Sequence, residues 1–112
     1  IWQQVQTSPG VPITDVFHVS GSDVALYAIQ NDGDVYVWGN NVHLADGNAA
    51  VNYDFATLMT PPPSTPTYIT AFYNDESNEH GVLALGVDRR MYGVGFNTSQ
   101  KLIDENTNAV LN

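Results

Sequence analysis

The side chains best able to do chemistry in this sequence are three histidines. His18, His43 and His80 stand far apart along the chain, whereas metal-binding histidines usually follow a short spacing that lets them converge. The sequence has no cysteine, and no Gly-x-Ser-x-Gly segment that would expose a nucleophilic serine on a tight turn. We therefore expect isolated histidines rather than a metal centre or a catalytic triad, with no cofactor and no enzymatic activity.

Carboxylates are densest in the segment Asp75-Glu76-Ser77-Asn78-Glu79, which is the best candidate for a calcium site because calcium prefers several oxygen ligands from one loop. The segment lacks the spacing of a twelve-residue calcium loop, so a solvated loop between strands is the alternative. Asn97-Thr98-Ser99 fits the acceptor sequence for N-glycosylation, although Asn97 also belongs to a repeated turn motif. Both alternatives stay open at the level of sequence.

Aromatic residues near expected strand ends form a third group. Tyr36, Trp38 and Tyr92 could stack on a sugar ring or anchor a partner, although aromatic residues in repeats more often fill the space between sheets. The segment from Asn40 to Thr60 is longer than a compact hairpin requires, and long loops on rigid scaffolds often carry function. The candidate binding-loop residues are His43, Asp46, Tyr53, Phe55, Phe96 and Asn97.

The charge balance argues against two classes of partner. The net charge is −9, and the only fixed cations are Arg89, Arg90 and Lys101. Nucleic-acid binding needs many lysine and arginine contacts to phosphate, so we expect no nucleic-acid partner. No stretch reaches the roughly 20 apolar residues of a membrane-spanning helix, so we expect no membrane insertion. Polarity supplied by Asn, Asp, Thr and Ser favours strands and turns, and we associate it with an extracellular or virion-surface protein.

An internal repeat must position these residues. The segment Asp32–Asn41 reads DGDVYVWGNN and returns, weakened, as DRRMYGVGFN in Asp88–Asn97, at an offset of 56 residues (88 minus 32). The offset holds without a gap back to Ile13, which matches Ile69. A fixed period of this length is typical of repeat architectures.

Each repeat is expected to be all-β. Short β-branched and aromatic runs lie between clusters of Gly, Pro, Asn and Asp, and no helical periodicity is present. We divide the chain into two blade-like repeats, residues 1–56 and 57–112. An outer strand and a proline-containing linker precede three meander strands each time, with strands expected at 1–6, 13–19, 24–29, 34–38, 53–59, 68–73, 81–85 and 91–94.

The two central hairpins differ in turn chemistry. Asp32-Gly33 suits a tight hairpin turn, because glycine tolerates positive φ. The corresponding Asp88-Arg89 has no glycine. We expect a different turn type or a wider loop at this second position, since arginine is disfavoured at positive φ.

At these residues the chain resembles the regulator of chromosome condensation repeat family of seven-bladed β-propellers. Its first box is similar to Ala25–Ile29 and Gly81–Leu85, and its strand-to-loop element is similar to Val35–Asn41 and Met91–Asn97. The family histidine is replaced by alanine in the first repeat and by glycine in the second, and the trailing Gly-Gln-Leu-Gly motif is degraded in both.

The resemblance implies an all-β fold of two four-stranded antiparallel β-propeller blades, part of a larger or oligomeric propeller. A lone blade cannot bury both faces and two blades cannot close a ring, so the expected partners are other blades from the same chain or from identical chains. Three identical chains would give six blades and four would give eight. The first residue, Ile1, suggests a processed or partial chain. The nucleotide-exchange and chromatin roles of the founding member are not implied, because no exchange-site residue is matched.

We interpret the chain as a non-catalytic interaction or structural module of an extracellular or virion-surface assembly, for example a phage tail or fibre component. The alternative is a carbohydrate-binding propeller lectin that uses loop aromatics and Asp or Asn side chains. The expected ligand is accordingly a protein or a glycan.

Overall fold

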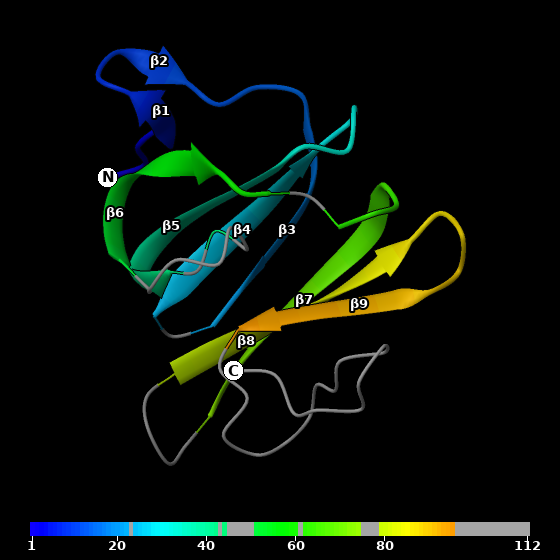
Figure 1. Ribbon diagram of the computed structural model, residues 1–112. Coiled ribbons are helices and arrows are strands. Elements are labelled where there is room, and N and C mark those ends of the chain that lie inside the picture. The colour runs from blue at the N-terminus through cyan, green and yellow to red at the C-terminus, as the bar shows by residue number, and fades with distance from the viewer. Residues whose placement is uncertain (23, 43, 45–50, 61, 75–78, 96–112) are drawn as a thin grey trace.

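The computed structural model describes residues 1–22, 24–42, 44, 51–60, 62–74 and 79–95. Over these residues the chain forms nine β-strands, all paired antiparallel, and the described part contains no helix (Figure 1). The expected all-β, antiparallel class is therefore confirmed. None of the described segments forms a helix that is long and apolar enough to cross a membrane.

The strands form three sheets. A four-stranded sheet contains β3 (Val16–Gly21), β4 (Ala25–Gln30), β5 (Val35–Val42) and β6 (Val51–Leu58) in that order. A three-stranded sheet contains β7 (Pro66–Asn74), β8 (Glu79–Gly86) and β9 (Met91–Gly95) in that order. At the N-terminus β1 (Gln6–Ser8) pairs only with β2 (Val11–Pro12), and β1 lies against β6.

The expected meander strands form in both halves of the chain. The outer strand expected at 53–59 forms as β6, which pairs with β5 as the fourth strand of the first sheet. The expected repeat boundary after residue 56 lies inside β6. The outer strand expected at 1–6 is wrong, because the chain turns back at Gly10 (φ 78°) and only Gln6 of that segment is part of a strand.

The sequence repeat corresponds to a repeated structure in the two central hairpins, β4–β5 and β8–β9. Ala28 on β4 lies opposite Tyr36 on β5, and Ala84 on β8 lies opposite Tyr92 on β9. Both pairs keep the offset of 56 residues (84 minus 28), so the two hairpins share one register.

The offset fails at the strand before each hairpin. Val19 lies opposite Ala28 in the first sheet, whereas Ile69 lies opposite Ala84 in the second. The sequence match of Ile69 is Ile13, which precedes β3. The gap-free match is therefore wrong over this strand by six residues (19 minus 13). The register of a strand depends on where its connecting loop closes. A match between two apolar residues in the sequence does not determine that register by itself.

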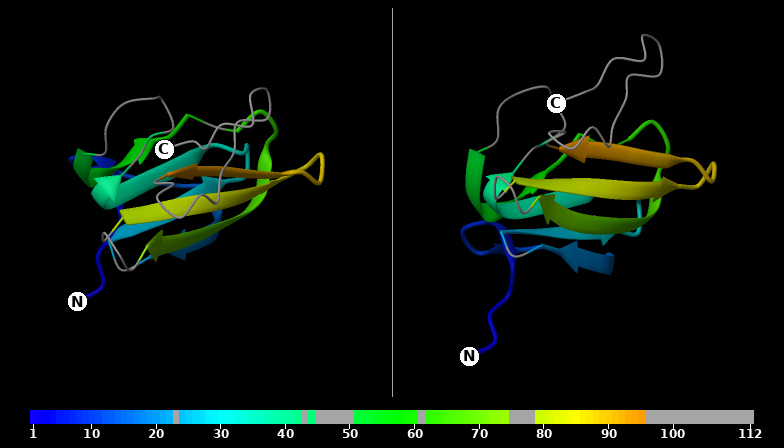
Figure 2. Two further views of the ribbon diagram at one scale, coloured as in Figure 1. Left: turned by 60° about the horizontal axis from the view of Figure 1, so that its bottom comes forward. Right: turned by 90° about the horizontal axis from the view of Figure 1, so that it is seen from below.

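The two larger sheets stack face to face, with β7 against β3 and β4 (Figure 2). Alternation along a strand sends odd-numbered side chains of β4 and β5 into the space between the sheets. The resulting core contains Tyr27, Ile29, Val35 and Val37 from the first sheet and Ile69, Val82 and Ala84 from the second.

The two repeats stack front to back, which means that opposite faces of the repeated sheet meet in the core. Tyr27 points into the core, but its repeat counterpart Leu83 lies on the outer face of the second sheet, opposite Gly93. Conversely, Val82 points into the core, whereas its counterpart Leu26 is exposed on the outer face of the first sheet. Equivalent faces of the two repeats therefore do not meet, and among the described residues no second sheet covers the other face of either one.

Side chains of β3 join the two sheets along one edge. His18 Nε2 donates to the carbonyl oxygen of Ile69 at 3.0 Å, and the backbone N–H of Ala71 donates to Ser20 Oγ at 3.0 Å. The His18 ring also meets the Tyr68 ring edge to face, with centroids 5.3 Å apart. His18 is thus a packing residue that fixes β7 on β3.

The expectation of a different turn after β8 is wrong. Arg89 adopts a φ of 65°, in the same left-handed region as Gly33 at 93°. The reason is that hairpin hydrogen bonds flank both loops at equivalent positions and hold the second loop in the geometry of the first.

Candidate binding surface

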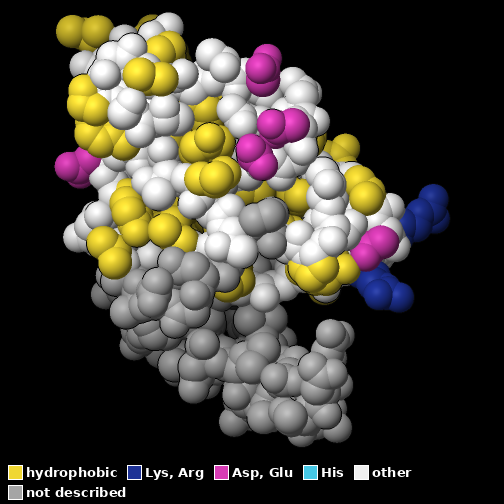
Figure 3. All heavy atoms as spheres, turned by 45° about the horizontal axis from the view of Figure 1, so that its top comes forward, with side chains coloured by type: hydrophobic (Ala, Val, Ile, Leu, Met, Phe, Trp, Pro, Cys, Tyr) yellow, Lys and Arg dark blue, Asp and Glu magenta, His cyan; other side chains and the backbone are white. Residues whose placement is uncertain are grey.

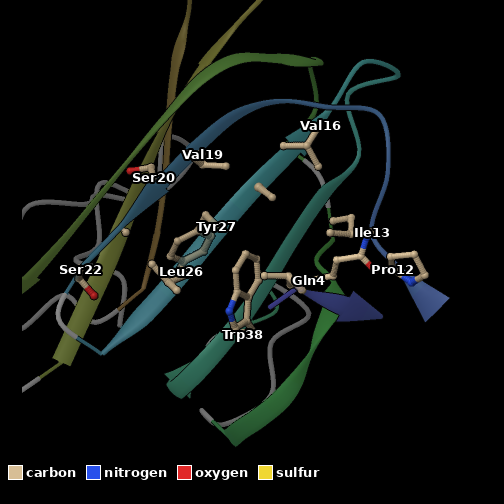
Figure 4. Close-up of a pocket in the computed structure, with 13 residues that line it drawn as sticks. Gln4, Pro12, Ile13, Val16, Val19, Ser20, Ser22, Leu26, Tyr27 and Trp38 are labelled. Carbon is tan, nitrogen blue, oxygen red and sulfur yellow. The ribbon is translucent and has the colours of Figure 1, made fainter. Parts of the chain in front are cut away.

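The outer face of the four-stranded sheet carries a hollow of about 750 Å³. Side chains of β3, β4 and β5 form its floor, and the N-terminal segment forms one wall (Figure 4). Because Leu26, Ala28, Tyr36 and Trp38 of β4 and β5 alternate with the core positions, this face is the part of the first sheet that the second sheet leaves uncovered.

Two rows of opposed residues make the floor. In one row Leu26 lies between Gly21 and Trp38, and in the other Ala28 lies opposite Val19. Leu26 keeps 46% of its surface exposed and Val19 keeps 67%. A Cβ at position 21 would lie 2.5 Å from Cδ2 of Leu26, so a larger residue there would displace the Leu26 side chain.

The N-terminal segment closes one side of this hollow. The backbone N–H of Ile13 donates to the carbonyl oxygen of Val5 at 3.0 Å, which holds the two arms of the segment together. Gln4, Val5, Pro12 and Ile13 all border the hollow. The wall is therefore built by residues that precede β3.

A second hollow of about 530 Å³ adjoins the first and shares Trp38 with it. Phe55 and Asp54 of β6 face this second hollow, together with three glutamines of the N-terminal segment, Gln3, Gln4 and Gln6. Trp38 and Phe55 thus lie on the same side of the sheet, at the border between an apolar floor and a polar rim.

The side chains that line these two hollows are suited to binding a ligand. The first is lined by apolar side chains with Gln4, Ser20 and Ser22 as its polar side chains, and none of the described residues that line it is charged. The second adds the carboxylate of Asp54. Such a surface can bury apolar groups, stack an aromatic ring on a flat ligand and exchange a few neutral hydrogen bonds.

A third hollow of about 300 Å³ lies between the two sheets. Core residues including Val35, Ile69 and Val82 line it, and Met59 and Pro62 of the linker between the sheets border it. It is a gap in the packing between the sheets rather than part of either outer face.

Among the residues that the structure describes, three groups have shifted pKa values. Burial raises the pKa of the Tyr27 phenol above its ordinary value. The pKa of Asp88 is lowered, first by the hydrogen bond that its Oδ2 accepts from Tyr92 Oη at 2.7 Å and then by the backbone N–H of Arg90. The same Asp88 hydrogen bond raises the pKa of Tyr92. Asp88 and Tyr92 lie at the tip of the β8–β9 hairpin, away from the first two hollows.

The candidate residues from the sequence have different outcomes. Tyr53 is half-buried on β6 and packs against the core, opposite Gly39. Phe55 is 38% exposed and faces the second hollow. His43, Asp46, Phe96 and Asn97 lie outside the described residues, as do residues 75–78 of the calcium candidate.

Sequence reasoning missed Val19, Leu26 and the N-terminal wall as parts of a surface. A signal for Leu26 was present, since a tight turn at Asp32-Gly33 places Leu26 opposite Trp38 and hence on the same face. No comparable signal existed for the N-terminal wall, because its position depends on contacts between segments far apart in the sequence.

The described residues contain no group of three or more His, Cys, Asp or Glu side chains that could hold a metal ion. Comparison of the chain with protein families, with curated proteins and with solved structures finds no match.

Proposed function

We propose that the chain is a non-catalytic interaction or structural module of an extracellular or virion-surface assembly, built from β-propeller blades of the regulator of chromosome condensation type. A phage tail or fibre component is one example of such an assembly. The observation that carries the proposal is the front-to-back stacking of two sheets, each of which keeps an apolar face free.

The free faces have the character of contact surfaces. On the first sheet Val19, Leu26 and Leu58 are 67%, 46% and 52% exposed. They belong to neighbouring rows of one face, since Val19 lies opposite Ala28, Ala28 opposite Tyr36 and Tyr36 opposite Leu58. Contiguous apolar surface of this kind on a soluble domain marks an interaction site more often than a chance exposure.

The charge distribution fits the same proposal. Within the described residues the arginines are Arg89 and Arg90, and Figure 3 shows the positive side chains together at one end of the molecule. On the outer face of the first sheet, the row Val19–Ala28–Tyr36–Leu58 and the row Gly21–Leu26–Trp38 hold no charged side chain. Contact through this face would therefore depend on apolar burial rather than on attraction of a charged ligand.

The proposal is tested with the native protein in its own source. Leu26→Glu places a carboxylate on the outer face, and Val11→Glu places one on the exposed β2 strand as a matched control. Size fractionation should find the unmodified protein and Val11→Glu in a large extracellular or particle-bound assembly, with Leu26→Glu released from it. A native protein that migrates alone, or that stays assembled with Leu26→Glu, would contradict the proposal.

The second candidate function is carbohydrate binding, and the position of Trp38 beside Phe55 favours it. The half-buried Trp38 and the exposed Phe55, bordered by Gln3, Gln6 and Asp54, offer a stacking surface with polar groups around it, which suits a sugar ring.

A glycan array decides between the two functions. A lectin should bind a defined glycan and lose that binding in Trp38→Ala and in Phe55→Ala, while thermal unfolding shows that both variants are folded. Phe17→Ala is the matched control, because Phe17 is an exposed aromatic residue that faces neither of these hollows. Absence of glycan binding by the unmodified chain would remove this candidate.

A further inference from the structure

We propose that the partner of the free sheet faces is a second copy of this chain, docked so that the outer face of its four-stranded sheet covers the outer face of the three-stranded sheet. This inference rests on the proposed function and adds the identity and orientation of the partner.

The outer face of the three-stranded sheet is apolar and exposed. Tyr68, Leu85 and Met91 lie opposite one another across β7, β8 and β9, and they are 60%, 41% and 69% exposed. The next row contains Leu83 between Thr70 and Gly93. No charged side chain occurs in either row, so this face can be buried without stranding a charge.

The repeat shows what would cover this face. Leu85 and Met91 are the counterparts of Ile29 and Val35, which are almost completely buried in the first sheet by contact with the second. The outer face of the second sheet therefore repeats a face that the same chain already uses for sheet-to-sheet contact.

The opposite free face repeats the other half of that contact. Leu26 and Ala28 on the outer face of the first sheet are the counterparts of Val82 and Ala84, which pack into the core from the second sheet. Within the β4–β5 and β8–β9 hairpins, the two outer faces thus correspond to the two sides of one interface that the chain forms internally. Two copies placed head to tail would rebuild this interface between chains.

The surface relief agrees with that arrangement. The hollow of about 750 Å³ on the first sheet has a floor of Leu26, Ala28 and Val19, with room above it for side chains of a partner. The other face offers protruding side chains, since Tyr68 and Met91 are both more than half exposed. A hollow facing protrusions permits closer packing than two flat faces would.

The interface is tested on the purified chain of residues 1–112 by sedimentation velocity over a wide range of protein concentration. The unmodified chain should associate as concentration rises. Leu26→Glu on one face and Leu85→Glu on the other should each weaken association by about a hundredfold, because each buries an unpaired carboxylate in an apolar contact. Val11→Glu, which lies on neither face, should associate like the unmodified chain.

Mixing the two disabled variants gives a sharper test. Leu26→Glu retains an intact three-stranded face, and Leu85→Glu retains an intact four-stranded face. The mixture should therefore form a one-to-one dimer that stops at that size, whereas each variant alone should associate about a hundredfold more weakly than the unmodified chain. Both substituted residues are more than 40% exposed in the single chain, so folding should survive, and circular dichroism checks this.

Three results would overturn the inference. They are a monomer at every concentration, association that survives both substitutions, and loss of association in only one of the two variants, which would indicate like faces packing together. If the purified chain is monomeric while the native protein still resides in an assembly that depends on Leu26, the partner is another protein. The proposed function then stands, and the inference about identical copies fails.

Discussion

The β4–β5 and β8–β9 hairpins have the same loop geometry with different residues at the position that needs left-handed backbone. In the first loop the N–H of Gly33 donates to the carbonyl of Gln30 at 2.9 Å, and in the second the N–H of Arg89 donates to the carbonyl of Gly86 at 3.1 Å. The difference teaches that the hairpin register, rather than the preference of one residue, determines this turn.

An aspartate helps both loops to keep that geometry. Asp32 Oδ1 accepts the backbone N–H of Asp34 at 3.0 Å, and Asp88 Oδ1 accepts the backbone N–H of Arg90 at 3.0 Å. In the second loop Asp88 also accepts a hydrogen bond from Tyr92. This additional bond lies in the loop that has to hold a non-glycine residue at positive φ.

The largest difference between the loops should come from adding a side chain to the first. In Gly33→Ala, the new Cβ would overlap the Thr65 side chain, and a φ of 93° is unfavourable for an L-residue. We expect the free energy of unfolding to fall by about 3 kcal/mol in urea denaturation. Gly10→Ala is the matched control, with φ 78° and open space around it, and should lose about 1 kcal/mol. Equal losses would contradict the crowding at Gly33.

The free energy of unfolding at high pH should depend on the core of the first sheet. Its core residue Tyr27 can ionise, whereas the repeat counterpart of Tyr27 in the second sheet is Leu83, which cannot. Burial raises the pKa of Tyr27 above 10.0, so the folded state holds the proton more tightly than the unfolded state. Its contribution is complete below pH 10 and is lost as pH rises towards the folded pKa. We expect stability to fall by about 1.4 kcal/mol per pH unit above pH 10. Denaturation at several pH values measures this slope, and Tyr27→Phe should reduce it to the part that Tyr92, whose pKa is also raised, contributes.

Relieving the positive φ of the second turn should have a smaller effect, and this effect should raise the free energy of unfolding. Arg89→Gly removes the penalty of positive φ at the cost of a more flexible unfolded chain, for a net gain of about 1 kcal/mol in the free energy of unfolding. Arg90→Gly, beside it but without positive φ, should lose about 0.5 kcal/mol. A loss of stability in both variants would show that the Arg89 side chain contributes more than its backbone costs.

The smallest effect concerns the additional hydrogen bond of the second loop. The low pKa of Asp88 means that its stabilising contribution is present at neutral pH and is lost as pH falls through the folded pKa. Tyr92→Phe should raise the Asp88 pKa towards its ordinary value in an NMR titration. Tyr36→Phe, the counterpart in the first hairpin, should leave the Asp88 pKa unchanged. A shift in both variants would point to a general change rather than to this bond.

The sequence predicted the parts of the fold that depend on short-range patterns. The turn at Asp32-Gly33 and the alternating residues around it place β4 and β5, and the repeat transfers that placement to β8 and β9. It failed at Ile13 and Ile69, which match in type but not in position, because strand register depends on loop closure and on pairing with the next strand.

The candidate surface was predictable only in part. Phe55 was identified by its type and its place in a long segment, and Trp38 by its position near a strand end. The hollow around Trp38 also needs Val5 and Ile13 from the segment before β3. Their packing depends on contacts between distant parts of the chain, which periodicity and propensity do not specify. For the same reason, the sequence could not indicate which sheet face would stay uncovered.

The contacts of His18 and Ser20 with β7 have a consequence for the solubility of the protein. β7 is a border strand, and its outward backbone groups at Ile69 and Ala71 would otherwise be available to an added strand from any other polypeptide. Because the imidazole and the hydroxyl already occupy them, this border cannot template intermolecular β-pairing at that point. Loss of either side chain would open the strand to the kind of zipper growth that leads to fibrils.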